Sequence, residues 1–411
     1  MKKKIISVLL STILIFQSGI IPLASANDSN PLNTAPYEKP KDVAPWNFSA
    51  KKYIAGGSLV LAAAAAGVYR LCGCFGSPFK EVLDKYSNFD VIFTQDEIFQ
   101  ICDKAIDILK DESCLLRISA PTIIVVGDIR GDFKTLKYCI NEFLRMVPQG
   151  AKIVFLGNYV GKKYFPLDTD TAPNTRIVML LLKLKIMYPD NVFLLLGKEE
   201  EGAANNSECE FRNEFDKVYP DAYVEEAECG RSCNTVFEKI TSVFNNFSLA
   251  LIGNDNIFCV HGGIFPGIDL SRIADEKKPI SYLFVASTEE EDVFEEEDVF
   301  VENNVFVEDL LWSNPDPNVS TFTENMTSEN IKSGGYSFGI QQANDFFTEH
   351  NLKYIVCSNR SGVPNGHRDV FGNNSVITMF SAPCGAQRKS PGAIAVFSGD
   401  NIQYKNVCYL P

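Results

Sequence analysis

Three short apolar runs, each followed by glycine and then a polar residue, constrain the fold of this chain more than any other feature of its sequence. The polar residues after the runs are Asp128, Asn158 and Lys198, and segments with helical periodicity separate the runs. Strands that alternate with helices in this way indicate an α/β core. Because the carboxyl ends of successive strands in such a core lie together, we expect these three side chains to converge on one site.

Helices are expected on both sides of these runs. Thr94 has the character of an N-cap, because acidic residues occupy the turn after it and apolar residues then recur at helical spacing. The same spacing predicts helices over 133–147, 175–188 and 236–247. The folded core is therefore expected to begin at about Thr94.

Further strands are expected in the second half of the chain. Two apolar runs joined by Asn254-Asp255-Asn256 predict a hairpin. The runs 352–358, 375–382 and 392–398 also have strand character. Their short connections predict that they pair in antiparallel fashion.

The N-terminal part of the chain has the pattern of a targeting region. Residues 1–26 combine a basic start, a long apolar run and small residues, which predicts an export signal. An uncleaved anchor is the alternative, because the run approaches the length of about 20 residues that a membrane span needs. Residues 27–50 are interpreted as a linker. Residues 51–76 hold a second apolar run, for which a membrane helix and a packed or interfacial helix both remain open.

These segments predict the location of the protein. We expect it to be exported, and then either secreted or associated with a membrane through residues 53–75. The 12 cysteines allow disulfides in that setting, with Cys229 and Cys233 as a close candidate pair. A zinc site is poorly supported, because the sequence has no CxxC and only 3 histidines.

The charge of the chain excludes some partners. A net charge of −14 argues against nucleic acid and against attraction to anionic membranes. Much of the excess acid lies in the segment 286–310, where a Val-Phe pair returns every six residues. That spacing fits neither a helical stripe nor a long strand, so we expect an exposed, low-complexity insertion, ordered in part by its Val-Phe pairs. It is either solvated filler or a docking strip for a basic partner.

From about Thr94 to Ser398 the order of segments resembles the serine/threonine phosphoprotein phosphatases, which are calcineurin-like metallophosphoesterases. "APTIIVVGDIRGDF" resembles their GD-x-H-G turn, "KIVFLGNYVGKK" their GD-x-V-D-R-G block, "MYPDNVFLLLGKEE" their GNHE segment, and "NIFCVHGGIFPGI" keeps HGG intact. The resemblance implies an α/β fold of two packed mixed β-sheets flanked by helices. It assigns a phosphatase-like domain to 77–399, with its core in 94–399, and leaves 400–411 as a C-terminal tail.

The resemblance also assigns the positions of the family's two-metal site. Two of the six ligand positions keep a ligand, and these are Asp128 and His261. The other four are degenerate and carry Arg130, Asn158, Lys198 and Asn359. The positions of the phosphate-binding arginines are also degenerate and carry Lys162 and Cys357. Glu199 stands where the family has its catalytic histidine, so no catalytic position is intact.

Arg130 changes the chemistry of this site most. A guanidinium has no lone pair for a metal and stays protonated at physiological pH, so it places a fixed positive charge where a metal is expected. We therefore expect no metal cofactor. We hypothesise that Arg130 and Lys198 replace the metals as counter-charges to Asp128, Glu199 and Glu200. The alternative is simple decay of the site, with both cationic side chains turned into solvent.

These substitutions predict a pseudophosphatase, that is, a catalytically inactive phosphatase-like protein. It would act by binding a protein partner, for which phosphorylated or basic segments are the candidates. The alternative is a residual metal-dependent phosphoprotein phosphatase, a phosphoric monoester hydrolase that would hold a single divalent ion such as Mn, Fe or Zn.

Overall fold

The computed structural model describes residues 78–161, 170–205, 210–224, 233–280, 297–326, 332–358, 363–383 and 390–407. The chain divides into two units, Met1–Ser58 and Leu59–Pro411, and all described residues belong to the second. The expected export signal, linker and apolar segment lie outside the described residues. Within the described ranges, no helix is both long and apolar enough to cross a membrane.

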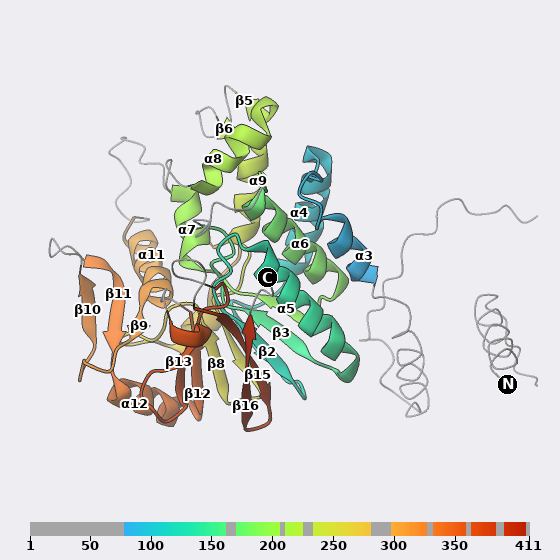
Figure 1. The fold of residues 1–411 in the computed structure, drawn as a ribbon. Helices are drawn as coiled ribbons and strands as arrows, with labels where there is room; N and C mark the ends of the chain where they lie inside the picture. The colour runs from blue at the N-terminus through green and yellow to red at the C-terminus, as the bar shows by residue number, and fades with distance from the viewer. Residues whose placement is uncertain are drawn as a thin grey trace, which may run out of the picture. The chain divides into compact units, whose positions relative to one another are not determined.

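A five-stranded sheet contains the three strands that the apolar runs predicted (Figure 1). These are β2 (Ile123–Val126), β3 (Lys152–Phe155) and β4 (Val192–Leu194), which are parallel neighbours in that order. β15 (Gly392–Ser398) pairs antiparallel with β2, and β16 (Asn401–Val407) pairs antiparallel with β15. Residues 401–407 are thus an edge strand of the sheet, whereas the sequence had suggested only a C-terminal tail.

A six-stranded sheet forms the second layer. Its strands, in spatial order, are β1 (Leu115–Ile118), β7 (Ala250–Gly253), β8 (Ile257–Val260), β12 (Tyr354–Cys357), β14 (Val376–Met379) and β13 (His367–Asp369). β7 and β8 form the predicted hairpin. Antiparallel pairing of the later strands is wrong for β12, which is parallel to both β8 and β14. The chain between β12 and β14 is not a tight turn, because it contains β13, which pairs antiparallel with β14. This connection brings the chain back to the end of the sheet where β12 begins, so that β14 can run parallel to β12.

The two sheets pack face to face. Side chains from alternate positions of both sheets, such as Val125 and Val154 on one and Leu251 and Val356 on the other, belong to one buried apolar cluster. A second and larger cluster lies on the opposite faces, where the sheets meet the helices. The expected α/β fold of two packed mixed sheets flanked by helices is therefore observed.

The predicted helices are present. α4 (Gln95–Leu109) begins at a capping box made by Thr94 and Glu97. The other three are α5 (Phe133–Met146), α6 (Pro173–Met187) and α9 (Thr235–Phe244). Further helices are α3 (Pro78–Lys85), α7 (Lys198–Asn205), α8 (Glu210–Val218), α10 (Leu270–Asp275) and α12 (Ile340–His350), with 3-10 turns at Val147–Gln149, Pro220–Ala222 and Pro364–Gly366.

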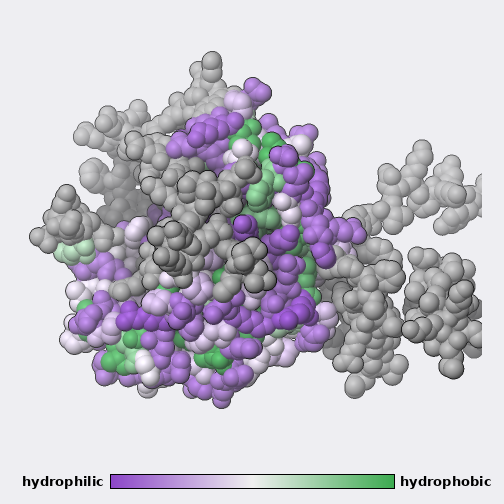
Figure 2. Space-filling model, in the orientation of Figure 1, coloured by the Kyte–Doolittle hydropathy of each residue, from purple (hydrophilic) through white to green (hydrophobic). Residues whose placement is uncertain are grey.

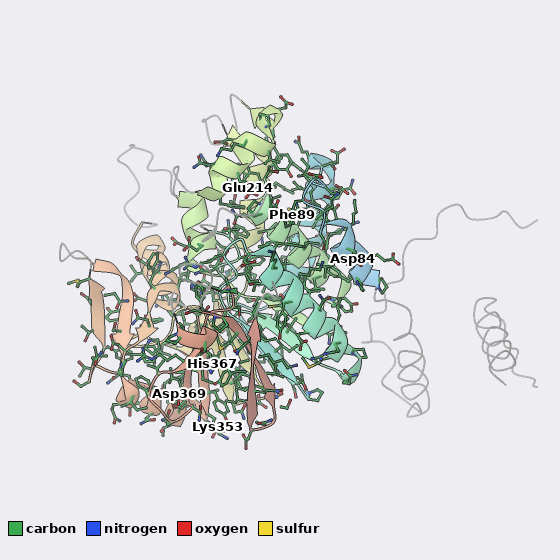
Figure 3. The ribbon with its side chains drawn as sticks, viewed as in Figure 1. Asp84, Phe89, Glu214, Lys353, His367 and Asp369 are labelled. Carbon is green, nitrogen blue, oxygen red and sulfur yellow. The ribbon has the colours of Figure 1, made fainter. Side chains whose placement is uncertain are left out.

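Buried ionic side chains fix the helices to one another. The Arg176 guanidinium, which is 1% exposed, makes two contacts of 2.8 Å and 3.0 Å with the carboxylate of Asp170. It also donates to the carbonyl of Phe89, in the segment between α3 and α4. Glu214 accepts hydrogen bonds from the backbone N–H groups of Asn174 and Thr175 at the start of α6. Figure 3 shows Glu214 and Phe89 in the helical part of the molecule.

The acidic segment is only partly an insertion. Glu297–Trp312 form helix α11, in which Phe306, Val307, Leu310 and Leu311 are buried. The expectation of an exposed insertion up to residue 310 is therefore wrong for its last turns, because the apolar residues of "VFVEDLL" lie at helical spacing. α11 packs against β11 (Lys332–Phe338), which forms a small sheet with β10 (Thr323–Met326) and β9 (Asn314–Pro315). A separate two-stranded ribbon contains β5 (Tyr223–Val224) and β6 (Cys233–Asn234).

Candidate functional site

The carboxylate of Asp128 is the centre of a polar cluster at the ends of β2, β3 and β12. Its side chain is fully buried. The Ser358 hydroxyl donates to Oδ1 at 2.5 Å, and the Asn158 amide donates to Oδ2 at 2.9 Å. Arg130 Nε lies 2.7 Å from the same Oδ2. Each oxygen of this buried carboxylate therefore faces at least one protein donor.

Arg130 joins two carboxylates. Its NH1 atom lies 3.0 Å from Oε1 of Glu199, and its side chain is only 11% exposed. The backbone of Arg130 has a φ of 48°, in the left-handed region that a non-glycine residue rarely adopts. The tight turn after β2 requires this conformation, and the Arg130 N–H donates to the carbonyl of Asn158. The ion pairs expected between Arg130 and both Asp128 and Glu199 are present.

Asn158 connects the three strand ends. Its side-chain amide donates to Asp128, and its Oδ1 accepts from the backbone N–H of Glu199 at 3.0 Å. The backbones of the β3 and β4 turns approach so closely that a Cβ added to Gly197 would lie 2.2 Å from the Asn158 nitrogen. Glycine is therefore required at Gly197, and the predicted convergence of Asp128 and Asn158 is confirmed.

Glu200 has a role that the sequence did not reveal. Its carboxylate accepts hydrogen bonds from the backbone N–H groups of Asn158, Tyr159, Val160 and Gly197 at 2.7–3.1 Å. Burial raises the pKa of Glu200 to about 7, although these amides oppose the shift. Glu200 thus binds the turn after β3 through backbone amides, in place of the expected pairing with a cation.

His261 is buried at the end of β8. Its Nδ1 lies 2.8 Å from the carbonyl oxygen of Leu156, which makes Nδ1 the protonated nitrogen of a neutral ring. Within the described part of the chain, Nε2 has no hydrogen-bond partner. Burial lowers the pKa of His261 to about 4, although the nearby charge of Asp128 opposes the shift. His261 is therefore uncharged at neutral pH.

Lys198 lies beside this cluster at the start of α7. Its Nζ is 5.0 Å from the centre of the Trp312 ring. Burial lowers the pKa of Lys198, while the charge of Asp128 raises it and that of Arg130 lowers it further. Lys198 therefore makes a cation–π contact with Trp312, in addition to its proposed role as a counter-charge.

The remaining predicted positions are Lys162, Asn359 and Cys357. Lys162 and Asn359 lie outside the described residues. Cys357 is buried, and its sulfur faces the carbonyl of Ile377 at 3.8 Å. Ser358, by contrast, was missed by the sequence analysis. Its position directly after β12, as a polar residue at a strand end, was the signal that could have identified it.

The described residues do not fit the pair of metal ions that the resemblance implies. Two of the groups nearest to Asp128, the Arg130 guanidinium and the Asn158 amide nitrogen, are donors that offer no lone pair. In the part of the chain that the structure describes, no three residues among His, Cys, Asp and Glu are placed to hold a metal. A two-metal centre would require the Arg130 ion pairs to be broken.

Comparison with known proteins places this site in a family context. The profile of the family described as calcineurin-like phosphoesterase matches residues 121–358. This span contains Asp128, Asn158, Glu199 and His261. It therefore includes the three strand-end turns of the five-stranded sheet that carry the polar cluster, as well as the HGG segment.

Two solved structures are similar to this chain to different degrees. A serine/threonine phosphatase from Saccharomyces cerevisiae has a TM-score of 0.58 at 18% identity, over 81% of this chain and 96% of that chain. A cold-active protein-tyrosine phosphatase from a psychrophilic Shewanella species has a TM-score of 0.46 at 11% identity, over 74% of this chain and 84% of that chain. At such low identities, likeness to a solved structure shows the fold alone, and of these two structures the yeast phosphatase is similar enough to show it.

Proposed function

The chain belongs to the calcineurin-like phosphoesterase family, and we propose that it is a member without hydrolytic activity that acts by binding a protein partner. The single observation that carries this proposal is the position of Arg130, whose Nε lies 2.7 Å from the buried Asp128 carboxylate. Lys198, the other cation at a ligand position, is consistent with this proposal but carries it less firmly, because burial lowers the pKa of its ammonium group.

The physical reason is electrostatic. In this family, metal ions polarise the phosphate and generate the nucleophilic hydroxide. Arg130 can neutralise Asp128, but it has no open coordination position and cannot lower the pKa of a water molecule as a metal does. With Glu199 in place of the catalytic histidine, the cluster also lacks the family's general acid. The site therefore keeps a positive charge that is complementary to a phosphate, but it has no activated nucleophile.

The same residues support anion binding. Arg130 is held on its buried side by Asp128, whereas Glu199, its other partner, is 32% exposed. An incoming phosphate could replace the Glu199 carboxylate on the guanidinium while the Asp128 contact is kept. We therefore propose that the site recognises a phosphorylated segment of a partner protein without cleaving it.

Hydrolysis and metal content of the full chain test this proposal. The chain is purified in Mn²⁺, and hydrolysis of a phosphoserine peptide is measured together with bound metal by elemental analysis. We expect neither turnover nor stoichiometric metal. Turnover that is lost in the Asp128→Asn variant would instead establish a residual metal-dependent phosphatase and refute the proposal.

A further inference from the structure

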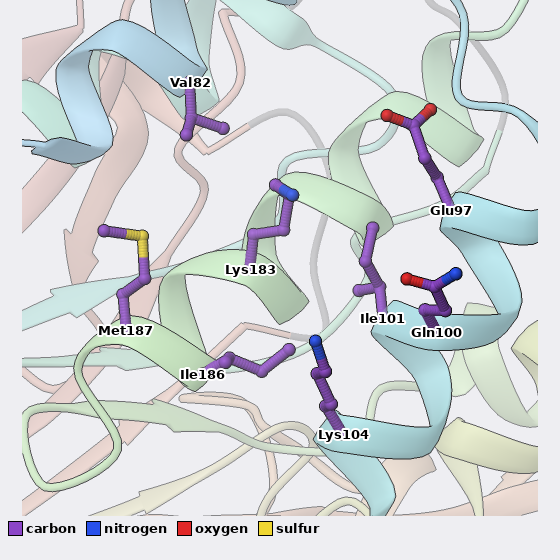
Figure 4. A pocket seen from close by; sticks show the side chains of 8 residues that line it. All are labelled: Val82, Glu97, Gln100, Ile101, Lys104, Lys183, Ile186 and Met187. Atoms are coloured by element: carbon purple, nitrogen blue, oxygen red, sulfur yellow. The ribbon is translucent and has the colours of Figure 1, made fainter. Parts of the chain in front are cut away.

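Helices α3, α4 and α6 enclose a groove of about 220 Å³ that is separate from the strand-end cluster (Figure 4). Its apolar lining consists of Val82, Ile101, Ile186 and Met187, and Met187 is 40% exposed. Figure 4 shows Lys104 of α4 and Lys183 of α6 extending into the same space beside these residues. Apolar surface is exposed near here, and Figure 2 shows it as a green strip among hydrophilic residues in the region of α4, α6 and α9.

The residues that line the groove include two lysines and one carboxylate, so the lining has a net positive charge. Neither Lys104 nor Lys183 has a hydrogen-bond or ion-pair partner among the described residues. Glu97 also lines the groove, but its carboxylate accepts from the backbone N–H of Thr94 and lies 3.5 Å from the ammonium of Lys85. Burial lowers the pKa of Lys183, the charge of Glu97 raises it, and the charges of Lys85 and Lys104 lower it further. An acidic, apolar ligand would match both properties of the groove.

The chain itself contains a segment of this chemistry. The sequence EEEDVF occurs twice in succession, over 289–294 and 295–300, and a third Val-Phe pair follows at Val305 and Phe306. The described structure shows how the third pair is used. Phe306 packs against Phe265 at 5.4 Å between ring centres, and the Arg272 guanidinium lies 4.2 Å above its ring. A phenylalanine of the repeat is thus bound by an apolar surface and a cation.

We propose that the groove between α3, α4 and α6 binds the acidic repeat, residues 289–300, of a second copy of this chain. A Val-Phe pair would occupy the apolar lining, and the preceding carboxylates would pair with Lys104 and Lys183. Acidic side chains would thereby neutralise two cations that the described residues leave unpaired, and the buried apolar area would add to the affinity.

The location of α11 favours a second copy over the same chain. α11 begins at Glu297 and packs on α7 and β11, and Figure 1 shows α11 and α3 on opposite sides of the molecule. The first repeat ends at Phe294, and three extended residues span only about 10 Å. The first repeat therefore cannot reach the groove of its own chain. A contact between different surfaces of two copies is head-to-tail and leads to rings or chains.

Sedimentation of the full chain over a range of concentrations tests this proposal. We expect self-association that grows with concentration, and that weakens at least about tenfold in the Lys104→Glu/Lys183→Glu variant. Adding Glu290→Lys/Glu291→Lys to that variant should restore the association, because both partners of the contact are then reversed. A monomer at every concentration, or association that ignores the lysine reversals, overturns the proposal.

A control variant and a peptide make the result specific. Lys277→Glu/Lys353→Glu makes the same change in net charge at exposed sites outside the groove and should associate like the unmodified chain. A synthetic peptide of residues 287–302 should dissociate the unmodified protein by competition, and its Phe294→Ala/Phe300→Ala form should do so much more weakly. This second measurement needs no groove variant, so a misfolded variant cannot mask a negative result. Equal competition by both peptides would contradict docking of the Val-Phe pairs.

Discussion

The side-chain amide of Asn158 donates to Oδ2 of Asp128 at 2.9 Å, and this is the same carboxylate oxygen that Arg130 contacts at 2.7 Å. The resemblance assigns both Arg130 and Asn158 to positions where the family has a metal ligand. A neutral amide and a fixed cation therefore satisfy one buried carboxylate that a metal would otherwise neutralise. This exchange leads to tests of stability, metal binding and anion binding.

Removal of Arg130 should destabilise the fold. In Arg130→Ala the buried Asp128 carboxylate loses its cation, and loss of one partner of a buried ion pair costs about 3 kcal/mol in the free energy of unfolding. Urea denaturation measures the change. As a control, Arg145→Ala removes a pair in which Arg145 is 62% exposed and should cost about 1 kcal/mol or less. Similar losses in the two variants would show that Arg130 has no special role as a counter-ion.

Restoration of the ligand set should restore metal binding. The variant Arg130→His/Asn158→Asp/Lys198→Asn/Asn359→His recreates all the positions that the resemblance assigns to ligands. We expect it to bind Mn²⁺ in calorimetric titration, because two cationic side chains are removed and the lone pairs of two imidazoles and a carboxylate are added. The unmodified chain should not bind. Adding Asp128→Asn should abolish binding; if it does not, the metal lies elsewhere.

Glu199 should act as an internal competitor of anions. Because its carboxylate is 3.0 Å from Arg130 and partly exposed, Glu199→Gln removes one carboxylate that competes with an external anion for the guanidinium. We expect about tenfold tighter binding of a phosphoserine peptide, measured by fluorescence anisotropy. Glu201→Gln, on the same helix, is the control for the change in net charge. An equal gain in both variants would indicate a general charge effect without a phosphate site at Arg130.

Glu214 should make stability depend on pH. Burial raises the pKa of Glu214 from 4.5 to about 7, and the folded state therefore holds a proton that the unfolded state releases at lower pH. Its contribution is fully present below pH 4.5 and is lost as the pH rises through about 7. The difference in unfolding free energy between the native chain and Glu214→Gln should change by up to about 3 kcal/mol between pH 4 and pH 8. A constant difference would mean that Glu214 does not titrate in this range.

Gly197 should tolerate no side chain. A Cβ there would lie 2.2 Å from the Asn158 nitrogen and 2.6 Å from Oε2 of Glu200, so the turns after β3 and β4 would have to separate. Overpacking against backbone of this kind costs about 3 kcal/mol. We expect Gly197→Ala to lower the unfolding free energy by about that amount, whereas Gly267→Ala, which meets no atom within 4 Å, should cost only about 1 kcal/mol for its positive φ. Equal losses would contradict the prediction and would mean that the turns after β3 and β4 can separate at little cost.

The sequence by itself determined the α/β core and its strand ends. Apolar runs that end in Gly and a polar residue specified β2, β3 and β4, because burial on both faces of a parallel strand leaves a continuous apolar signal. The convergence of Asp128 and Asn158 followed from that topology. The side chain of Arg130 also excluded a metal ligand at its position before any geometry was known, because its chemistry does not depend on its surroundings.

Only the tertiary structure decided which partners these side chains take. Glu200 faces four backbone amides instead of a cation, and Ser358 reaches Asp128 across 230 residues of sequence. Likewise, burial against Phe265 placed Phe306 in a core helix, whereas its repeat suggested exposure. The periodicity of apolar residues in the sequence predicts only which face of a single helix or strand is buried. The pairing of donors with acceptors depends on how distant turns pack, and that is fixed by the closing of the two sheets on each other.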